Sequence, residues 1–226
     1  ALSSLAPQLP EAVKEQAVGE ALTTAREIQS VMLRVQALSR LLPHLPEGMQ
    51  REVLLEAYGK AQKIHDEYAR ADALSSLTPY LPESMHREAL VTGSMFEAES
   101  CRAQTLSSLA PYLTESLLGE AISTTQAMDL DFYRAETLSG LAPFLPEGLL
   151  AKALAMAREI QDVDSRAQAL CGLALHLPEG LRSEVLLEAQ EFQDQAPRAQ
   201  VLSSLAAYLP ETLLGEALVA VRGISS

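Results

Sequence analysis

The sequence repeats itself along its length with a period of 32–36 residues. Residues 134–162 read RAETLSGLAPFLPEGLLAKALAMAREIQD, and residues 166–194 read RAQALCGLALHLPEGLRSEVLLEAQEFQD. Each copy after the first opens with an arginine, and these arginines are Arg34, Arg70, Arg102, Arg134, Arg166 and Arg198. A fixed period of this length predicts a repeat protein, in which every unit packs mainly on its neighbours.

A Leu-Pro-Glu junction divides each copy into two halves. Its proline recurs as Pro10, Pro46, Pro82, Pro146, Pro178 and Pro210, with Thr114 in its place in the fourth copy. Seven copies fill the 226 residues, with approximate boundaries at 1–33, 34–69, 70–101, 102–133, 134–165, 166–197 and 198–226. We therefore expect one helical-repeat domain over residues 1–226. Because the first residue is Ala rather than Met, we also expect a piece of a longer chain.

Both halves of a copy carry apolar residues at helical spacing. In the copy that opens with Arg134, Leu138, Leu141 and Leu145 fall on one face of a helix of about twelve residues. In the second half, a helix of about fifteen residues has a second stripe, made of Leu149, Ala153, Leu154, Ala157 and Ile160. No segment alternates with the period of two that a strand requires. Each copy is therefore predicted to form an αα-hairpin.

The predicted helices have chemical start and stop signals. Pro143 and Pro146 separate the two halves of one copy, because proline removes a backbone donor and is best tolerated in a first turn. Residues that suit a helix N-cap precede four of the opening arginines: Ser30, Asp66, Asp162 and Asp194. The first two second halves have four extra residues, so their helices should be about one turn longer.

A single hairpin cannot bury its apolar faces alone, so we expect an all-α, right-handed α-solenoid of about seven αα-hairpins. The Asp-x-x-x-Arg-Ala-x-Ala-Leu run at 162–170 resembles HEAT repeats, whereas the tetratricopeptide signature is absent. The whole unit is similar to the RAxALxxLAPxLPExLLxEAL repeats of large bacterial, notably cyanobacterial, multidomain proteins. In those proteins such arrays commonly accompany signalling ATPase modules of the STAND type. The resemblance implies a repeat architecture and an effector module elsewhere in the full protein.

The six opening arginines lie on the same face of the first helix as its leucines. A lone buried charge there would be costly. We expect a structural ladder, in which each arginine pairs with the capping Asp four residues earlier or with a Pro-Glu carboxylate. The alternative is a row of arginines that binds an anion.

The first helix carries small polar residues opposite its leucines, as at Gln104, Ser107 and Ser108, whereas the second carries charges such as Lys152 and Glu159. Helices on the concave side of a stack crowd together, so we assign the first helices to a concave wall. The serines could instead simply mark close packing.

A column of mostly ring-bearing residues flanks the polar face. It lies ten residues after each opening arginine and at the equivalent place in the first copy: Gln8, His44, Tyr80, Tyr112, Phe144, His176 and Tyr208. Rings with polar tips suit a peptide groove, but they could equally fill the joints between hairpins. The candidate partner-binding face consists of Arg40, Asp72, Ser76, Tyr80, Gln104, Ser108, Tyr112, Glu136, Phe144, Gln168, His176, Gln200 and Tyr208.

The residue inventory argues against several classes of function. The formal charge of −13 repels nucleic-acid phosphates and anionic membrane surfaces. Cys101 and Cys171 occupy non-equivalent positions of the repeat, which argues against a disulfide framework and suits a reducing cytoplasm. No phosphate-binding loop, GxSxG or HExxH motif occurs in the sequence. We therefore predict no enzyme activity, no cofactor, no metal and no binding of DNA or a membrane.

The preferred hypothesis is a non-catalytic scaffold or ligand-sensing arm that recognises a protein or peptide along the concave face. One alternative is a structural spacer, or an array that associates end to end, since neither end of the sequence resembles a polar cap. A more distant alternative is an RNA-binding helical repeat, against which the net charge counts.

Overall fold

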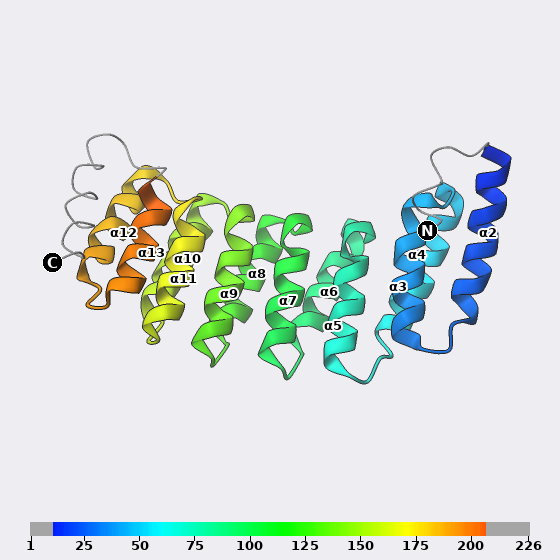
Figure 1. Cartoon of the computed structure of the whole chain (residues 1–226), viewed down its shortest axis with the longest axis horizontal. Helices are drawn as coiled ribbons and strands as arrows, with labels where there is room; N and C mark the ends of the chain where they lie inside the picture. The colour runs from blue at the N-terminus through cyan, green and yellow to red at the C-terminus, as the bar shows by residue number, and fades with distance from the viewer. Residues whose placement is uncertain (1–10, 207–226) are drawn as a thin grey trace. The chain divides into compact units, whose positions relative to one another are not determined.

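The described part of the chain consists of short helices, in which the first and second helices of the predicted hairpins alternate (Figure 1). The computed structural model describes the backbone of residues 11–206 and the side chains of residues 16–206, and no strand occurs within this range. The second helices of the hairpins are α2 (Glu11–Glu27), α4 (Glu47–Ala61), α6 (Glu83–Ser94), α8 (Glu115–Gln126), α10 (Glu147–Glu159) and α12 (Glu179–Glu191). The first helices are α3 (Val31–Leu41), α5 (Glu67–Leu77), α7 (Glu99–Leu109), α9 (Asp131–Leu141), α11 (Val163–Ala174) and α13 (Gln195–Ala206).

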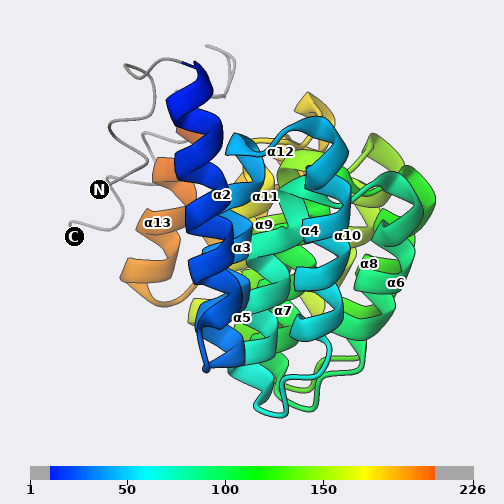
Figure 2. The same cartoon turned by 90° about the vertical axis from the view of Figure 1, so that its right-hand side faces the viewer.

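The described residues belong to two compact units, which meet in the sequence between Met85 and His86. In the second unit, α7, α9, α11 and α13 pack side by side in chain order, and α8 packs on α10 in a separate layer (Figure 2). In the first unit, α3 packs against α2, α4 and α5. Within residues 11–206, the packing of helices on their chain neighbours and on the next helix but one confirms the predicted all-α, solenoid-like repeat.

The predicted apolar stripes form the core. Leu138 and Leu141 are fully buried, as are Ala153 and Ala157 of the second helix in the same hairpin. One assignment differs, because Leu150 is buried while Leu149 remains half-buried. At about 25 cal/mol per Å² of apolar surface removed from water, these stripes provide the main driving force for stacking the hairpins.

A proline in the first half determines how a first helix ends. Where proline stands nine residues after the arginine, the helix passes into a short 3-10 turn: Leu42–His44, Thr78–Tyr80, Ala110–Tyr112 and Ala142–Phe144. In the sixth copy Leu175 takes the place of this proline, and α11 continues to Ala174 without such a turn. The missing N–H of proline therefore shortens the α-helix by one residue.

The predicted capping residues and helix lengths are largely confirmed. The side chains of Ser30, Asp66 and Asp162 each accept a hydrogen bond from the backbone N–H three residues later. Asp194 also precedes its helix, α13, and its carbonyl accepts from the Arg198 backbone. As expected from the extra residues, α2 and α4 have 17 and 15 residues, whereas α6, α8, α10 and α12 have 12 or 13.

The cap at Asp162 makes the stability of α11 depend on pH. Hydrogen bonds from the Ser165 hydroxyl and backbone N–H lower the pKa of Asp162 below its ordinary value of 3.8. A carboxylate with a lowered folded-state pKa stabilises the fold above about pH 4, and this contribution disappears as pH falls through the folded-state pKa. We expect Asp162→Ala to lower the free energy of unfolding at pH 7 and to match the wild type near pH 2, as measured by urea denaturation. Asp162→Asn, which caps without titrating, should lack the part of the acid-induced loss of stability that Asp162 causes. An unchanged pH dependence in this variant would contradict the prediction.

The row of opening arginines binds backbone carbonyls at the ends of the preceding second helices. Each guanidinium donates to the carbonyl six residues earlier, over 2.6–3.2 Å: Ile28, Ile64, Phe96, Met128, Ile160 and Phe192. These carbonyls lie at the negative end of a helix dipole, where a cation is favourable. The partner that all six opening arginines share is therefore a backbone carbonyl, and not the capping or Pro-Glu carboxylate that the sequence suggested.

Carboxylates three residues before the arginine join some of these contacts. Arg102 lies 3.0 Å from Glu99, and the Glu99 carboxylate accepts hydrogen bonds from the backbone N–H groups of Asp129 and Leu130 at 2.6 and 2.9 Å. In the next copy, Asp131 accepts from Gln161 and Asp162 at 2.9 and 2.8 Å. Each carboxylate thereby links the start of one first helix to the loop before the next, about 30 residues along the chain.

Candidate functional site

The predicted partner-binding face lies on the first helices, and its members are not equally accessible. Exposed members are Arg40, Asp72, Tyr80, Gln104, Glu136, Phe144, His176 and Gln200. Ser76, Ser108, Tyr112 and Gln168 are half-buried, and Tyr208 lies outside the described residues. The residues two positions after the arginines are therefore mostly exposed, whereas the serines are half-buried or buried.

The joints between first helices in the second unit are closed by small residues. A Cβ atom added at Gly140 would lie 2.8 Å from the Ser107 Cβ, and one at Gly172 would lie 2.8 Å from the Ser139 Cα. Distances below 3.0 Å are incompatible with ordinary packing, so the two glycines allow α7, α9 and α11 to approach closely. The sequence contained this signal, since both glycines stand six residues after an opening arginine.

The serine hydroxyls on this face donate to their own helices. Ser39, Ser76 and Ser108 each donate to the carbonyl three residues earlier, over 2.7–3.0 Å. These hydroxyls therefore retain lone pairs to accept a hydrogen bond, but their protons are already in use. This arrangement favours the interpretation that the serines mark close packing.

The column of rings lies mainly at the surface. Tyr80 and Phe144 are 37% and 40% exposed, and His44 and His176 are also exposed. Tyr112 is half-buried and its ring centroid lies 6.1 Å from that of His86. Among the members that the structure describes, Tyr112 thus comes nearest to the predicted joint-filling role, while Tyr80 and Phe144 present their rings to solvent.

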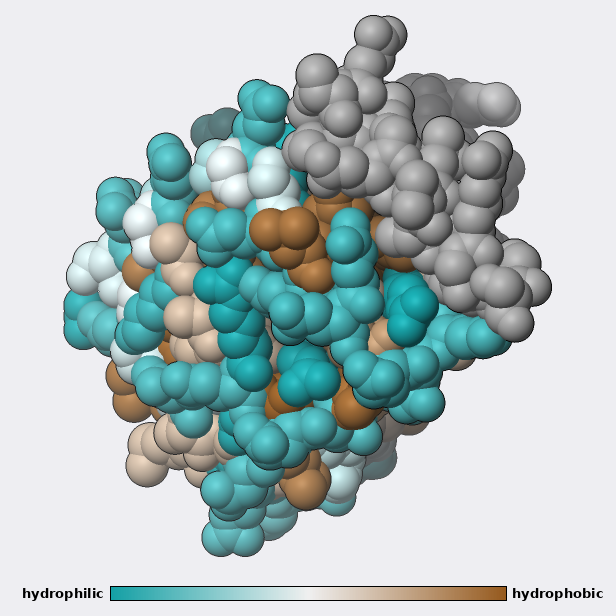
Figure 3. Space-filling model, turned by 90° about the vertical axis from the view of Figure 1, so that its left-hand side faces the viewer, coloured by the Kyte–Doolittle hydropathy of each residue, from teal (hydrophilic) through white to brown (hydrophobic). Residues whose placement is uncertain are grey.

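Two features of the described surface bear on other classes of function. Among residues 16–206, no group of three or more His, Cys, Asp or Glu side chains is placed to hold a metal ion. No described helix has both the length and the apolar character to cross a membrane. On the face in Figure 3, hydrophilic side chains predominate and apolar ones form separate patches.

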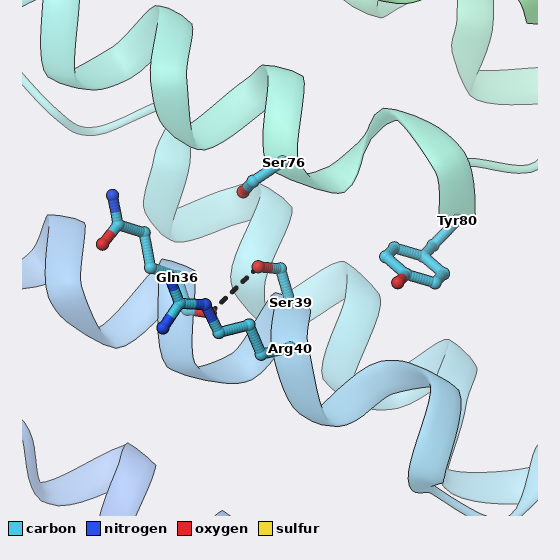
Figure 4. A pocket seen from close by; sticks show the side chains of 5 residues that line it. All are labelled: Gln36, Ser39, Arg40, Ser76 and Tyr80. Carbon is cyan, nitrogen blue, oxygen red and sulfur yellow. Dashed lines mark hydrogen bonds between the residues drawn. The ribbon is translucent and has the colours of Figure 1, made fainter. Parts of the chain in front are cut away.

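A hollow of about 270 Å³ lies between α3 and α5 on the predicted face of the first unit (Figure 4). It is lined by Gln36, Ser39, Arg40, Ser76 and Tyr80. The structure therefore brings together three of the residues selected from sequence, Arg40, Ser76 and Tyr80. Gln36 and Ser39 were missed, although Gln36 occupies the same repeat position as Asp72 and could have been found from the register.

The hollow combines a cation, an amide and a ring. In Figure 4 the Gln36 amide and the Arg40 guanidinium lie toward one end, the Tyr80 ring lies toward the other, and the two serines lie between them. Ser39 is buried and donates to the Gln36 carbonyl at 3.0 Å. Because serine forms both sides of this joint, in place of the serine–glycine contacts of the second unit, α3 and α5 leave room for a small group.

No family model, curated protein or solved structure matches the chain. Its function is therefore inferred from its own residues.

Proposed function

We propose that this protein is a non-catalytic scaffold or ligand-sensing arm that binds a protein or peptide on the face formed by its first helices. The proposed architecture is a right-handed α-solenoid of about seven hairpins over residues 1–226. In this proposal the array works in the bacterial cytoplasm, attached to a signalling module elsewhere in a longer chain. The first helices form the concave side.

The observation that carries this proposal is the hollow lined by Arg40 and Tyr80. Interfaces are enriched in arginine and aromatic residues, whose side chains bring large contact areas and directional hydrogen bonds. Here both types are exposed around a hollow, with Phe144 exposed on the equivalent face of the second unit. A polar hollow with an exposed ring beside it is better suited to binding a peptide than to packing against a flat protein surface.

Several charged side chains of the second helices form ion pairs with one another, which supports placing the partner on the face of the first helices. Arg158 binds Glu188 at 2.6 Å and Glu184 at 2.8 Å. Arg26 contacts Glu56 and Glu52 in the same pattern, at 2.9 and 3.2 Å. These pairs join adjacent second helices, so the stacking of the hairpins explains why these charged residues are present.

The second candidate function is a structural spacer or self-associating array. The close contacts at Gly140 and Gly172 favour it, because they explain small residues on the first helices by packing alone. RNA binding stays a distant third, since the chain carries 30 acidic residues against 17 Lys and Arg.

A peptide-display selection against the full chain tests the proposal. We expect selected peptides to lose about tenfold in affinity, measured by fluorescence anisotropy, when Tyr80→Ala or Phe144→Ala removes an exposed ring. The matched controls are Leu55→Ala and Leu187→Ala, which truncate side chains that are 49% and 58% exposed on second helices. If the controls weaken binding as much as the ring variants, or if no peptide is selected, the spacer function is favoured instead.

A further inference from the structure

Arg40 differs from the other arginines of the first helices. Arg34, Arg70, Arg102, Arg134, Arg166 and Arg198 all bind carbonyls of preceding helices. Arg40 instead is exposed at the edge of the hollow, and the structure gives it neither an ion pair nor a hydrogen bond within the described residues. Packing and capping therefore account for the opening arginines but leave the Arg40 guanidinium available.

The groups beside Arg40 are suited to an anion. The Gln36 amide can donate hydrogen bonds from the same end of the hollow (Figure 4). Among the described side chains no carboxylate lines the hollow, although Asp72 is exposed one turn before Ser76 on α5. One guanidinium and one amide thus form a small donor cluster on the surface of a protein whose net charge is −13.

The cluster matches a carboxylate better than a phosphate. A guanidinium has a planar fork of N–H donors that binds the two oxygens of a carboxylate side by side. Its single charge balances one carboxylate, whereas a phosphate dianion would keep an uncompensated charge in an acidic protein. The volume of about 270 Å³ suits a single side chain or chain end rather than a cofactor.

The remaining walls can hold the part of the ligand next to the carboxylate. The hydroxyls of Ser39 and Ser76 have donated their protons to the helix and can accept a hydrogen bond from a peptide N–H. Tyr80, toward the other end, offers a ring face to aliphatic carbons and a hydroxyl to a carbonyl. We infer that the hollow between α3 and α5 is a binding site for a carboxylate of a peptide, held by Arg40 and Gln36.

This inference rests on the proposed peptide-binding function and names the chemistry of one of its sites. The carboxylate could be an acidic side chain or a chain terminus. Three small probes separate these cases: N-acetyl-glutamate N-methylamide carries only the side-chain carboxylate, N-acetyl-glutamine carries only the terminal one, and N-acetyl-glutamine N-methylamide carries neither.

The experiment is a titration of the isotope-labelled full chain with each probe, followed by amide chemical shifts. We expect at least one carboxylate probe to shift the signals of residues 36–40 and 76–80, with a dissociation constant on the order of millimolar, and the neutral probe to leave them unchanged. Arg40→Gln should weaken this binding by about five- to tenfold. Arg51→Gln on α4, which makes the same change in net charge on an exposed residue away from the hollow, should leave binding as it is.

Binding of the neutral probe equal to that of the carboxylates, or unchanged binding in Arg40→Gln, would overturn the inference. Selected peptides that depend on Tyr80 while no carboxylate probe binds would also overturn it, yet leave the proposed function standing. Carboxylate binding that depends on Arg40 without any selected peptide supports the site and removes the wider peptide-binding function.

Discussion

Gly172→Val should lower the free energy of unfolding by about 3 kcal/mol, the upper end of the range for overpacking a filled core. Even the first added carbon would lie 2.5 Å from the Ser139 Cβ and 2.8 Å from its Cα. A flexible side chain could turn away, but a backbone atom moves only if α9 and α11 separate. Urea denaturation followed by circular dichroism measures the loss.

Two variants make this prediction specific to the joint. Gly119→Ala in α8 adds a methyl group where no atom lies within 4 Å, and should stabilise the protein by up to about 1 kcal/mol through helix propensity. The double variant Ser139→Gly/Gly172→Ser exchanges the two residues of the joint. It should lose less stability than Gly172→Val, because the joint again holds one small side chain. If Gly172→Val and Gly119→Ala behave alike, the close approach of α9 and α11 has no energetic consequence.

Arg102→Met should cost about 3–5 kcal/mol of stability, because it leaves a buried carboxylate without its cation. The Glu99 side chain is only 8% exposed and lies 3.0 Å from the Arg102 guanidinium. The substitution also removes the donor to the Phe96 carbonyl, at 2.6 Å. The same denaturation experiment gives the magnitude.

Arg166→Met is the comparison that the repeat itself provides. Arg166 also donates to a helix-end carbonyl, at Ile160, but Val163 stands where Glu99 stands in the earlier copy. Its loss should therefore be about 1–3 kcal/mol, the range for a hydrogen bond made by a charged group. Glu99→Gln/Arg102→Met removes both charges but keeps a side-chain oxygen that can accept from the Asp129 and Leu130 N–H groups, and it should restore part of the stability lost in Arg102→Met. Equal losses at Arg102 and Arg166 would show that the carboxylate contributes nothing.

The sequence predicts the helices well because burial and backbone chemistry leave strong local signals. The helical spacing of Leu138 and Leu141 places both on one buried face, and Pro143 ends a helix because it lacks the backbone N–H. The capping role of Asp162 follows equally from its place before an apolar-periodic segment. These features depend on a few neighbouring residues, so they can be predicted from the sequence of a single copy of the repeat.

The polar contacts were harder to predict because they join different copies. Periodicity indicates that Arg102 faces the core, but it does not reveal that a helix-end carbonyl lies there. Glu99 binds N–H groups about 30 residues further along, so its role depends on how the copies are stacked. The hollow likewise arises from the combined side chains of two helices, Arg40 on one and Tyr80 on the other. Small polar residues suit both a solvent-facing surface and a close helix contact, which left the serines ambiguous.

The carboxylate links at Glu99 and Asp131 give the array a direction. Each one lies in an earlier copy and satisfies the backbone of the following copy, at 129–130 and at 161–162. Removing a copy from the N-terminal side therefore strips the next copy of hydrogen-bond acceptors, whereas removal from the C-terminal side only leaves a carboxylate open to water. Fraying should accordingly travel more easily toward the C-terminus, and the order of the copies matters even where their sequences are nearly interchangeable.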